Sequence, residues 1–368
     1  MDQIIFRPRD VDLSRSPLRG QVDDETFVLG AFNPGFTRLP NGNLLLLVRV
    51  AEALRHPVRN DHVAILRWSN GRFGLDRHSH EGIDTRDPRE LRIKGGIHKT
   101  IILTSISWLL PVELSPDGTR IIATHYDRAI TPRASYQEYG VEDPRISRVD
   151  GCYYMTCCSV SAERLCTSLY TSGNAFDWKL EGVVLDHQNK DMLIFEGKVG
   201  GKFMALTRPA GEVYLIPPPD ADFSPGPAIQ LAQSPDAIHW KPLDFGAIRP
   251  KKNSASSMKV GGGTPPILTP DGWLELYHGV EAGEVVGKYR TFWALLDRDD
   301  PSQVLRIEDN EPLLEANPSL CPDLAEARYL NNIVFTTGIV EDGDDYIVAS
   351  GEDDMACRLT RIPKSRFS

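Results

Sequence analysis

An acidic pair, Glu142 and Asp143, is the clearest candidate in this sequence for acid–base chemistry. Pro144 follows the pair, and a residue before proline is biased towards an extended backbone, so we expect the Asp143 carboxyl group to be held in one direction. A general acid must be fixed in this way beside the bond that it protonates. The alternative for so short a motif is a solvated loop in which the carboxylates pair with Arg145.

Three basic side chains stand at the ends of strongly apolar runs. Arg49 follows residues 44–48, Arg208 closely follows residues 203–206, and His278 ends a third run. A charged group at the end of such a strand is costly to bury alone, so it should meet an anion or open water. Together these side chains predict a local anion pocket, for which phosphate or carboxylate is the usual ligand. Pairing of each arginine with a nearby aspartate or glutamate is the alternative.

The elements that carry these residues repeat one layout: a polar head, a strand, a turn with glycine and a second, apolar strand. The expected hairpins lie near residues 33–49, 143–158, 196–208, 263–278 and 332–350. Their turns contain Asn41-Gly42, Asp150-Gly151, Gly200-Gly201, Asp271-Gly272 and Asp342-Gly343. Glycine accepts the positive φ that a primed hairpin turn requires. Apolar residues at helical spacing are nearly absent, so we expect an all-β chain.

Recurrence of a hairpin unit is typical of a closed repeat architecture, and for antiparallel strands the natural form is a β-propeller. Five units give about 70 residues per blade, enough for four short strands and their loops. The even spacing favours a single domain over residues 1–368. Inner strands would then bring their polar heads together in one central funnel, namely Asn33, Asp143, Lys198, Lys259 and Asp354. A β-sandwich with ordinary polar turns is the alternative fold.

Composition excludes several classes of function. The formal net charge of −10 argues against general binding to nucleic acid or to an anionic membrane, which both need clustered positive charge. The first residues lack the basic and then apolar pattern of a signal peptide, and no apolar run approaches the ~20 residues that span a bilayer, so we expect a cytoplasmic protein. The 6 cysteines form no CxxC pair, and no metal site is expected.

With these motifs together, the chain resembles glycoside hydrolase family 130, the β-mannoside phosphorylases and related mannosidases. The resemblance runs from about residue 33 to residue 354 and implies a five-bladed β-propeller. It rests on five short motifs in the right order: Phe32-Asn33-Pro34-Gly35, Leu47-Val48-Arg49-Val50, Glu142-Asp143-Pro144-Arg145, Gly262-Gly263-Thr264-Pro265-Pro266-Ile267 and Gly272-Trp273-Leu274-Glu275-Leu276-Tyr277-His278-Gly279-Val280.

The resemblance also implies roles for particular residues. Asp143 would be the proton donor, which in this family is thought to act through the 3-hydroxyl of the sugar. The mannose at the cleavage subsite would be held by Asn33, Arg49, Lys259 and Asp354. Phosphate would be held by Lys190, Arg208, His278 and Tyr289. Three positions depart from the family pattern: Lys190 where arginine is common, the Phe195-Glu196-Gly197-Lys198 segment where the family more often has Phe-Pro-Glu-Lys, and the residues before Asp354.

These residues predict an inverting phosphorylase that cleaves a β-mannoside with inorganic phosphate to give mannose 1-phosphate. An inverting hydrolase needs a second carboxylate to activate water, whereas phosphate is already a nucleophile, and no second carboxylate is obvious in the sequence. We expect a β-mannoside and phosphate as ligands, no cofactor, and neither nucleic acid nor membrane as a partner. A β-mannosidase of the same family and a non-catalytic glycan-binding propeller are the alternatives. Linkage and oligomeric state stay open, and subsite or interface loops are expected over residues 78–108.

Overall fold

The computed structural model describes residues 1–95, 100–211, 213–243, 248–283 and 285–367. Strands dominate this part of the chain, which confirms the prediction of an all-β protein. Within these ranges, no helix is long and apolar enough to cross a membrane. The helices described are short 3₁₀ turns: η1 (Pro8–Asp10), η2 (Leu13–Arg15), η3 (Tyr126–Arg128), η4 (Ser135–Gln137), η5 (Pro318–Leu320), η6 (Pro322–Leu324) and η7 (Lys364–Phe367).

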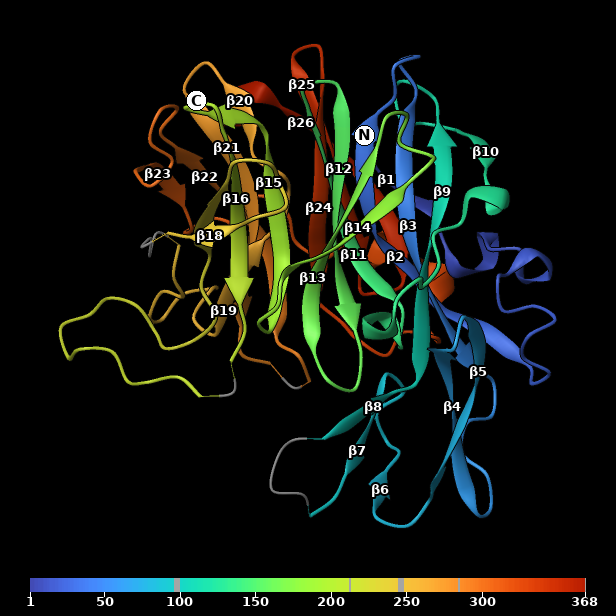
Figure 1. The fold of residues 1–368 in the computed structure, drawn as a ribbon. Coiled ribbons are helices and arrows are strands. Elements are labelled where there is room, and N and C mark those ends of the chain that lie inside the picture. The colour runs from blue at the N-terminus through green and yellow to red at the C-terminus, as the bar shows by residue number, and fades with distance from the viewer. Residues whose placement is uncertain (96–99, 212, 244–247, 284, 368) are drawn as a thin grey trace.

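The described strands build five antiparallel sheets of four or five strands, which follow one another along the chain (Figure 1). Sheet 1 holds β2 (Thr26–Arg38), β3 (Leu44–Leu54), β9 (Ser105–Leu114) and β10 (Ile121–Thr124). Sheet 2 holds β11 (Val141–Val149), β12 (Cys152–Val160), β13 (Leu165–Ser172) and β14 (Lys179–Leu185). Sheet 3 holds β15 (Asn189–Val199), β16 (Lys202–Pro209), β17 (Gln230–Ser234) and β18 (Lys241–Pro242).

Sheet 4 holds β19 (Lys259–Gly262), β20 (Ile267–Thr269), β21 (Gly272–Glu281), β22 (Lys288–Leu296) and β23 (Val304–Glu308). Sheet 5 joins the two ends of the chain, because it holds β24 (Val334–Asp342), β25 (Asp345–Glu352), β26 (Ala356–Pro363) and β1 (Asp2–Phe6). The N-terminal strand pairs with β26, and Arg358 on β26 holds Asp2 with a contact of 2.7 Å. Each sheet contacts the next, and sheet 5 returns to sheet 1 through β24 and β2.

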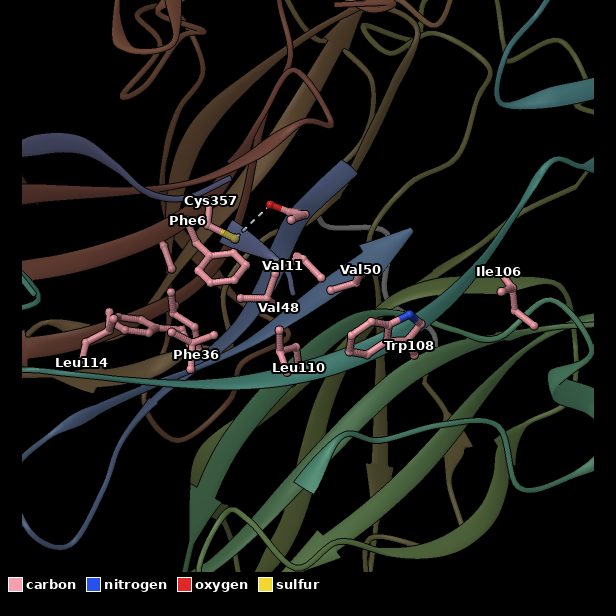
Figure 2. Close-up of a cluster of buried hydrophobic side chains, with 14 of the residues drawn as sticks. Phe6, Val11, Phe36, Val48, Val50, Ile106, Trp108, Leu110, Leu114 and Cys357 are labelled. Atoms are coloured by element: carbon pink, nitrogen blue, oxygen red, sulfur yellow. Dashed lines mark hydrogen bonds between the residues drawn. The ribbon is translucent and has the colours of Figure 1, made fainter. Parts of the chain in front are cut away.

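Hydrophobic clusters fill the space between successive sheets. Alternate residues of β3 divide between two of them: Leu44, Leu46 and Val48 pack towards sheet 5, whereas Leu45 and Leu47 pack towards sheet 2. This explains the uninterrupted apolar run, since a strand covered on both faces has no solvent side to alternate with. Figure 2 shows the cluster between sheets 5 and 1, where Phe6 and Cys357 meet Phe36, Val48 and Leu110.

The glycine turns join paired strands in each sheet. In Asp150-Gly151 and Gly200-Gly201 both central residues have positive φ, as a type I′ turn requires. In Asn41-Gly42 and Asp342-Gly343 the glycine alone has positive φ, with values of 89° and 63°. Turn chemistry therefore marks the places where the chain reverses, while the turn type varies among the hairpins.

A separate module lies between β3 and β9 and projects from the five sheets, as Figure 1 shows in its lower part. It consists of two small sheets: β4 (His62–Ser69) with β5 (Arg72–Ser79), and β6 (Ile83–Asp84), β7 (Glu90–Ile93) and β8 (Ile101–Leu103). The segment over residues 78–108, which we expected to hold subsite or interface loops, falls largely within it. Residues 96–99 lie outside the described part of the chain.

One acidic residue is buried inside a hydrophobic cluster. Glu275 on β21 is 0% exposed, and neither carboxyl oxygen has a hydrogen-bond partner in the described structure. It lies on the same face of the strand as Trp273 and Tyr277, which pack between sheets 3 and 4. Burial raises the pKa of Glu275 well above its usual value, so the folded protein keeps this group protonated.

This burial predicts an effect on stability. The unfolded chain releases the Glu275 proton at a lower pH than the folded protein does, so the free energy of unfolding falls as the pH rises above the unfolded pKa. Glu275→Leu should raise the free energy of unfolding at pH 7.5 by about 1–3 kcal/mol and reduce its dependence on pH. Urea unfolding at pH 5 and pH 7.5 measures this. Glu163→Leu, at a side chain that is 84% exposed, is the control, and an equal gain there would contradict the explanation.

Candidate active site

In each of the strands β2, β11 and β15, a polar residue lies in a β-bulge. The register shifts between Phe32 and Gly35 on β2, between Glu142 and Arg145 on β11, and between Lys190 and Leu193 on β15. At these bulges Asn33, Asp143 and Asp191 have φ values of 45°, 49° and 56°. Asparagine and aspartate tolerate this left-handed conformation better than other residues with a side chain. Bulges commonly re-aim a side chain beside an active site.

The extended backbone expected for Asp143 is therefore wrong, because φ is 49°. The bulge overrides the bias imposed by Pro144, and neighbouring groups satisfy the backbone carbonyls that it frees. The Asp143 carbonyl accepts a hydrogen bond of 3.0 Å from Arg145, and in the separate bulge of β2 the Pro34 carbonyl accepts one of 2.6 Å from Thr337 on β24. The direction of the Asp143 side chain thus depends on contacts within its own strand and on the surrounding sheets.

Asp143 is held by two donors. Its Oδ1 accepts hydrogen bonds of 3.0 Å from Asn33 Nδ2 and 2.8 Å from Arg49. Although burial opposes ionisation, the positive charges of Arg49 and Lys190 hold the pKa of Asp143 well below its usual range. The carboxylate is therefore ionised in the free protein.

Glu142 faces the same arginine from the neighbouring position. Its Oε1 accepts a hydrogen bond of 2.8 Å from Arg49, and its Oε2 accepts one of 3.3 Å from Lys190. Burial disfavours the charge on Lys190, but the adjacent Glu142 carboxylate raises the pKa of this lysine above its usual value. Glu142 is thus paired with Arg49 and Lys190, and Asp143 with Arg49, so the alternative of a solvated loop in which both pair with Arg145 is wrong.

A second buried group surrounds Asp191 on β15. Arg208 Nε donates a hydrogen bond of 2.6 Å to Asp191 Oδ2, and His278 Nε2 lies 3.7 Å from the same oxygen. An Arg145 nitrogen lies 3.9 Å from Asp191 Oδ1. Burial lowers the pKa of His278 to about 3, so the imidazole is neutral. Arg208 is thus paired with a carboxylate in the free protein. This is the alternative that the sequence had left open.

Tyr289 and Lys259 complete this side of the site. The Tyr289 ring centroid lies 5.5 Å from that of His278, and Lys259 Nζ lies 4.9 Å from the Tyr289 ring centroid. Burial, reinforced by the charge of Arg208, lowers the pKa of Lys259 to about 8. Burial also raises the pKa of Tyr289 to about 12, so its hydroxyl group remains a donor at neutral pH.

Asp354 closes the other side. Burial raises its pKa to about 6, while the charges of Arg49 and Arg89 act in the opposite direction. The backbone carbonyl of Asp354 accepts a hydrogen bond of 3.0 Å from the Tyr329 hydroxyl. Glycine is needed nearby, since a Cβ at Gly351 would lie 2.0 Å from Asn33 Oδ1.

The structure therefore brings together every residue in the expected site: Asn33, Arg49, Asp143, Lys190, Arg208, Lys259, His278, Tyr289 and Asp354. Grouping Lys198 with these heads is wrong. Its Nζ lies 2.8 Å from the Asp150 carboxylate, in the turn between β11 and β12. Lys198 stands near the opposite end of β15 from Asp191, and therefore at the other end of the sheet.

The sequence did not identify Asp191 as a member of the site. Asp143 was expected to stand without an obvious second carboxylate, yet Glu142, Asp191 and Asp354 all lie nearby. The signal for Asp191 was its place in Asn189-Lys190-Asp191, at the head of an inner strand like Asn33 and Asp143. The absence of carboxylates thus cannot decide between phosphate and water as the nucleophile.

Comparison with known proteins places the chain in a class. The family model for glycoside hydrolase family 130, described as beta-1,4-mannooligosaccharide phosphorylase, matches residues 104–366. A beta-1,2-mannobiose phosphorylase of Listeria innocua is 32% identical over 341 residues, which cover 89% of this chain and 87% of the relative. A 1,2-beta-oligomannan phosphorylase of Thermoanaerobacter sp. is 35% identical over 254 residues, which cover 66% of this chain and 74% of the relative.

Solved structures agree. A beta-1,2-mannobiose phosphorylase from Listeria innocua, in complex with beta-1,2-mannobiose, has a TM-score of 0.81 at 28% identity, over 99% of this chain and 97% of the other. Together with the site, these matches define a carbohydrate-active enzyme that cleaves mannosides with phosphate. The chain belongs to glycoside hydrolase family 130, as its motifs predicted.

The close approach at Gly351 makes a prediction. Gly351→Ala should push Asn33 away from Asp143, because the new methyl group would overlap the Asn33 amide. We expect kcat/KM for the mannoside to fall at least about tenfold with a small change in Tm. The control is Gly173→Ala, where an added Cβ meets nothing within 4 Å. Equal activity of the two variants would mean that the position of Asn33 is not important.

Proposed function

We propose that this protein is an inverting phosphorylase that cleaves a β-1,2-linked mannoside with inorganic phosphate and releases α-mannose 1-phosphate. The observation that carries the proposal is the buried basic pocket of Lys190, Arg208 and Lys259 beside Asp143. The β-1,2 linkage is inferred from the relatives, because those matching most of this chain are named for β-1,2-mannobiose or β-1,2-oligomannan. A β-1,4 linkage, named in the family description, is the alternative substrate.

The fold that we propose is one five-bladed β-propeller over residues 1–368. Support comes from five sheets that contact one another in cyclic order, from the strand β1 that completes sheet 5, and from hydrophobic clusters between successive sheets. In this arrangement β2, β11, β15, β19 and β24 are the inner strands, and their bulged ends form the site. Homo-oligomeric assembly is left open.

On the sugar side, we assign mannose binding to Asn33, Arg49, Lys259 and Asp354. Asn33 and Arg49 both contact Asp143, and Arg49 also influences Asp354. A sugar held by these groups would therefore place its reacting end against the Asp143 carboxyl group. Arg89, in the projecting module, lies close enough for its charge to lower the pKa of Asp354. It also forms an ion pair of 2.9 Å with Asp87. We expect this pair to face the leaving sugar.

On the phosphate side, we assign binding to Lys190, Arg208, His278 and Tyr289. In the free protein, Lys190 forms an ion pair with Glu142, and Arg208 forms one with Asp191. Five basic side chains nevertheless face four acidic ones: Arg49, Arg145, Lys190, Arg208 and Lys259 against Glu142, Asp143, Asp191 and Asp354. The one cation in excess of the carboxylates favours binding of an anion such as phosphate.

The proton balance of the reaction suits a carboxyl group that is ionised at rest. The glycosidic bond breaks, a phosphate oxygen bonds to the anomeric carbon, and the leaving oxygen gains one proton. Hydrogen phosphate dianion loses one proton when it becomes the dianion of mannose 1-phosphate, so no proton is consumed overall. Asp143 need only carry this proton during the reaction, directly or through the sugar's 3-hydroxyl.

Hydrolysis is the second candidate because other carboxylates are present. A base must be free to take a proton from water. Glu142 and Asp191 each bind basic side chains, whereas Asp354, whose pKa burial raises to about 6, is largely ionised at neutral pH and is the carboxylate suited to act as this base. A glycan-binding protein without activity would need neither an acid nor the basic pocket.

Asp143→Asn tests the acid directly. We expect turnover of β-1,2-mannobiose with phosphate to fall by at least about 10³-fold, because the amide cannot deliver a proton, while mannobiose binding is largely retained. Coupled detection of mannose 1-phosphate gives the rate and calorimetry gives the affinity. Wild-type protein without phosphate is the control. Equal release of mannose with and without phosphate would contradict the proposed function.

Arg208→Ala tests the phosphate pocket. Loss of this guanidinium should raise KM for phosphate by about tenfold or more, because a charge-assisted contact is lost, with a much smaller change in KM for the mannoside. The control is Arg77→Ala, at an exposed position on β5. An equal rise in both KM values would place Arg208 outside a dedicated phosphate site.

A further inference from the structure

Four side chains of alternating charge connect the basic pocket to the proposed proton donor, and of these Lys190 is the most exposed, at 31%. Lys190 Nζ lies 3.3 Å from Glu142 Oε2, and Glu142 Oε1 lies 2.8 Å from Arg49. Arg49 in turn lies 2.8 Å from Asp143 Oδ1. Glu142 is 7% exposed and Arg49 is 14% exposed, so water screens these charges weakly.

Glu142 and Arg49, the two middle residues of this series, each contact two partners of opposite charge. Glu142 divides its charge between two cations, and Arg49 divides its donors between two carboxylates. If another anion draws one cation away from a shared carboxylate, that carboxylate interacts more strongly with the cation that remains. A change at Lys190 must therefore alter the contact between Arg49 and Asp143.

We propose that Glu142 is a positioning residue that transmits phosphate binding at Lys190 to Asp143. This rests on the proposed function, in which Lys190 binds phosphate and Asp143 handles the proton. When phosphate engages Lys190, Glu142 draws Arg49 towards itself, and Arg49 loosens its hold on Asp143. The aspartate can then accept the proton that phosphate brings. Without phosphate, Arg49 keeps Asp143 ionised, which suppresses cleavage by water.

Other groups also act on Asp143, and a test must hold them constant. Those that face it are Asn33 from β2, Arg49 from β3, Glu142 and Arg145 from β11, Cys157 and Cys158 from β12, Lys190 and Asp191 from β15, and Asp354 after β25. Glu142→Gln changes Glu142 and leaves the other groups in place. The amide keeps the shape of the side chain and an acceptor for Arg49, but it removes the charge.

The experiment measures kcat for β-1,2-mannobiose at saturating phosphate from pH 5 to pH 9, as the ratio of variant to wild type. Taking the ratio cancels the titration of phosphate itself. In Glu142→Gln, Arg49 stays on Asp143, so we expect kcat to fall about tenfold or more at pH 8 and the loss to become smaller as the pH falls, because protons become more available to Asp143. KM for the mannoside should stay within about threefold.

The matched control is Glu52→Gln. Glu52 is also buried, on β3, and accepts hydrogen bonds from Ser16, Thr26 and Trp108. The kcat of Glu52→Gln, divided by that of wild type, should not vary with pH. A loss in Glu142→Gln that is the same at every pH, or no loss, would overturn the proposal.

Two further results keep the inference distinct from the proposed function. Lys190→Met leaves Glu142 with Arg49 as its remaining cation, so it should increase the release of mannose in the absence of phosphate, and combining it with Glu142→Gln should abolish this increase. If Glu142→Gln does not fold, a Lys190→Met variant that releases mannose without phosphate no faster than wild type overturns the inference. Wild-type turnover without phosphate would instead refute the proposed function, whatever the variants show.

Discussion

Charge pairing inside a buried site is the constraint on which the rest of this structure depends. A buried ion without a partner is strongly unfavourable, so each basic group must meet an acid or a ligand. Arg49 and Lys190 satisfy this requirement on Glu142 and Asp143, and Arg208 does so on Asp191. The free protein thus keeps its basic pocket neutralised by its own carboxylates, while one surplus cation remains for a substrate anion.

The fold provides this pairing through bulges in the inner strands. A regular strand would alternate its side chains between the two neighbouring sheets, and every position would be buried against them. At Asn33, Asp143 and Asp191 an extra residue in a left-handed conformation interrupts this alternation. Three consecutive sheets therefore present a polar side chain at the same end. Left-handed backbone at residues other than glycine costs about 1–3 kcal/mol each, and such residues cluster at functional sites.

The sequence was sufficient for the elements and for most members of the site. Glycine turns located the five main hairpins, whereas the burial of β3 on both faces became clear only in the structure. Short motifs identified the family. The sequence was insufficient where a β-bulge changes the direction of a side chain. Asp191 was not recognised as a site residue, and Pro144 alone predicted the wrong backbone conformation for Asp143. Lys198 was misplaced because a position along a strand does not reveal which end faces the site.

We infer that Asp143 is the acid of this mannoside phosphorylase, and Arg49 and Lys190 keep its carboxylate ionised in the free protein. The most direct measurement of this account is the product formed from β-1,2-mannobiose in phosphate buffer, followed by proton and phosphorus NMR from the first turnovers. Attack by bound phosphate on the face opposite the leaving sugar predicts α-mannose 1-phosphate and one equivalent of mannose. Two equivalents of free mannose, or a phosphate of β configuration, would contradict it.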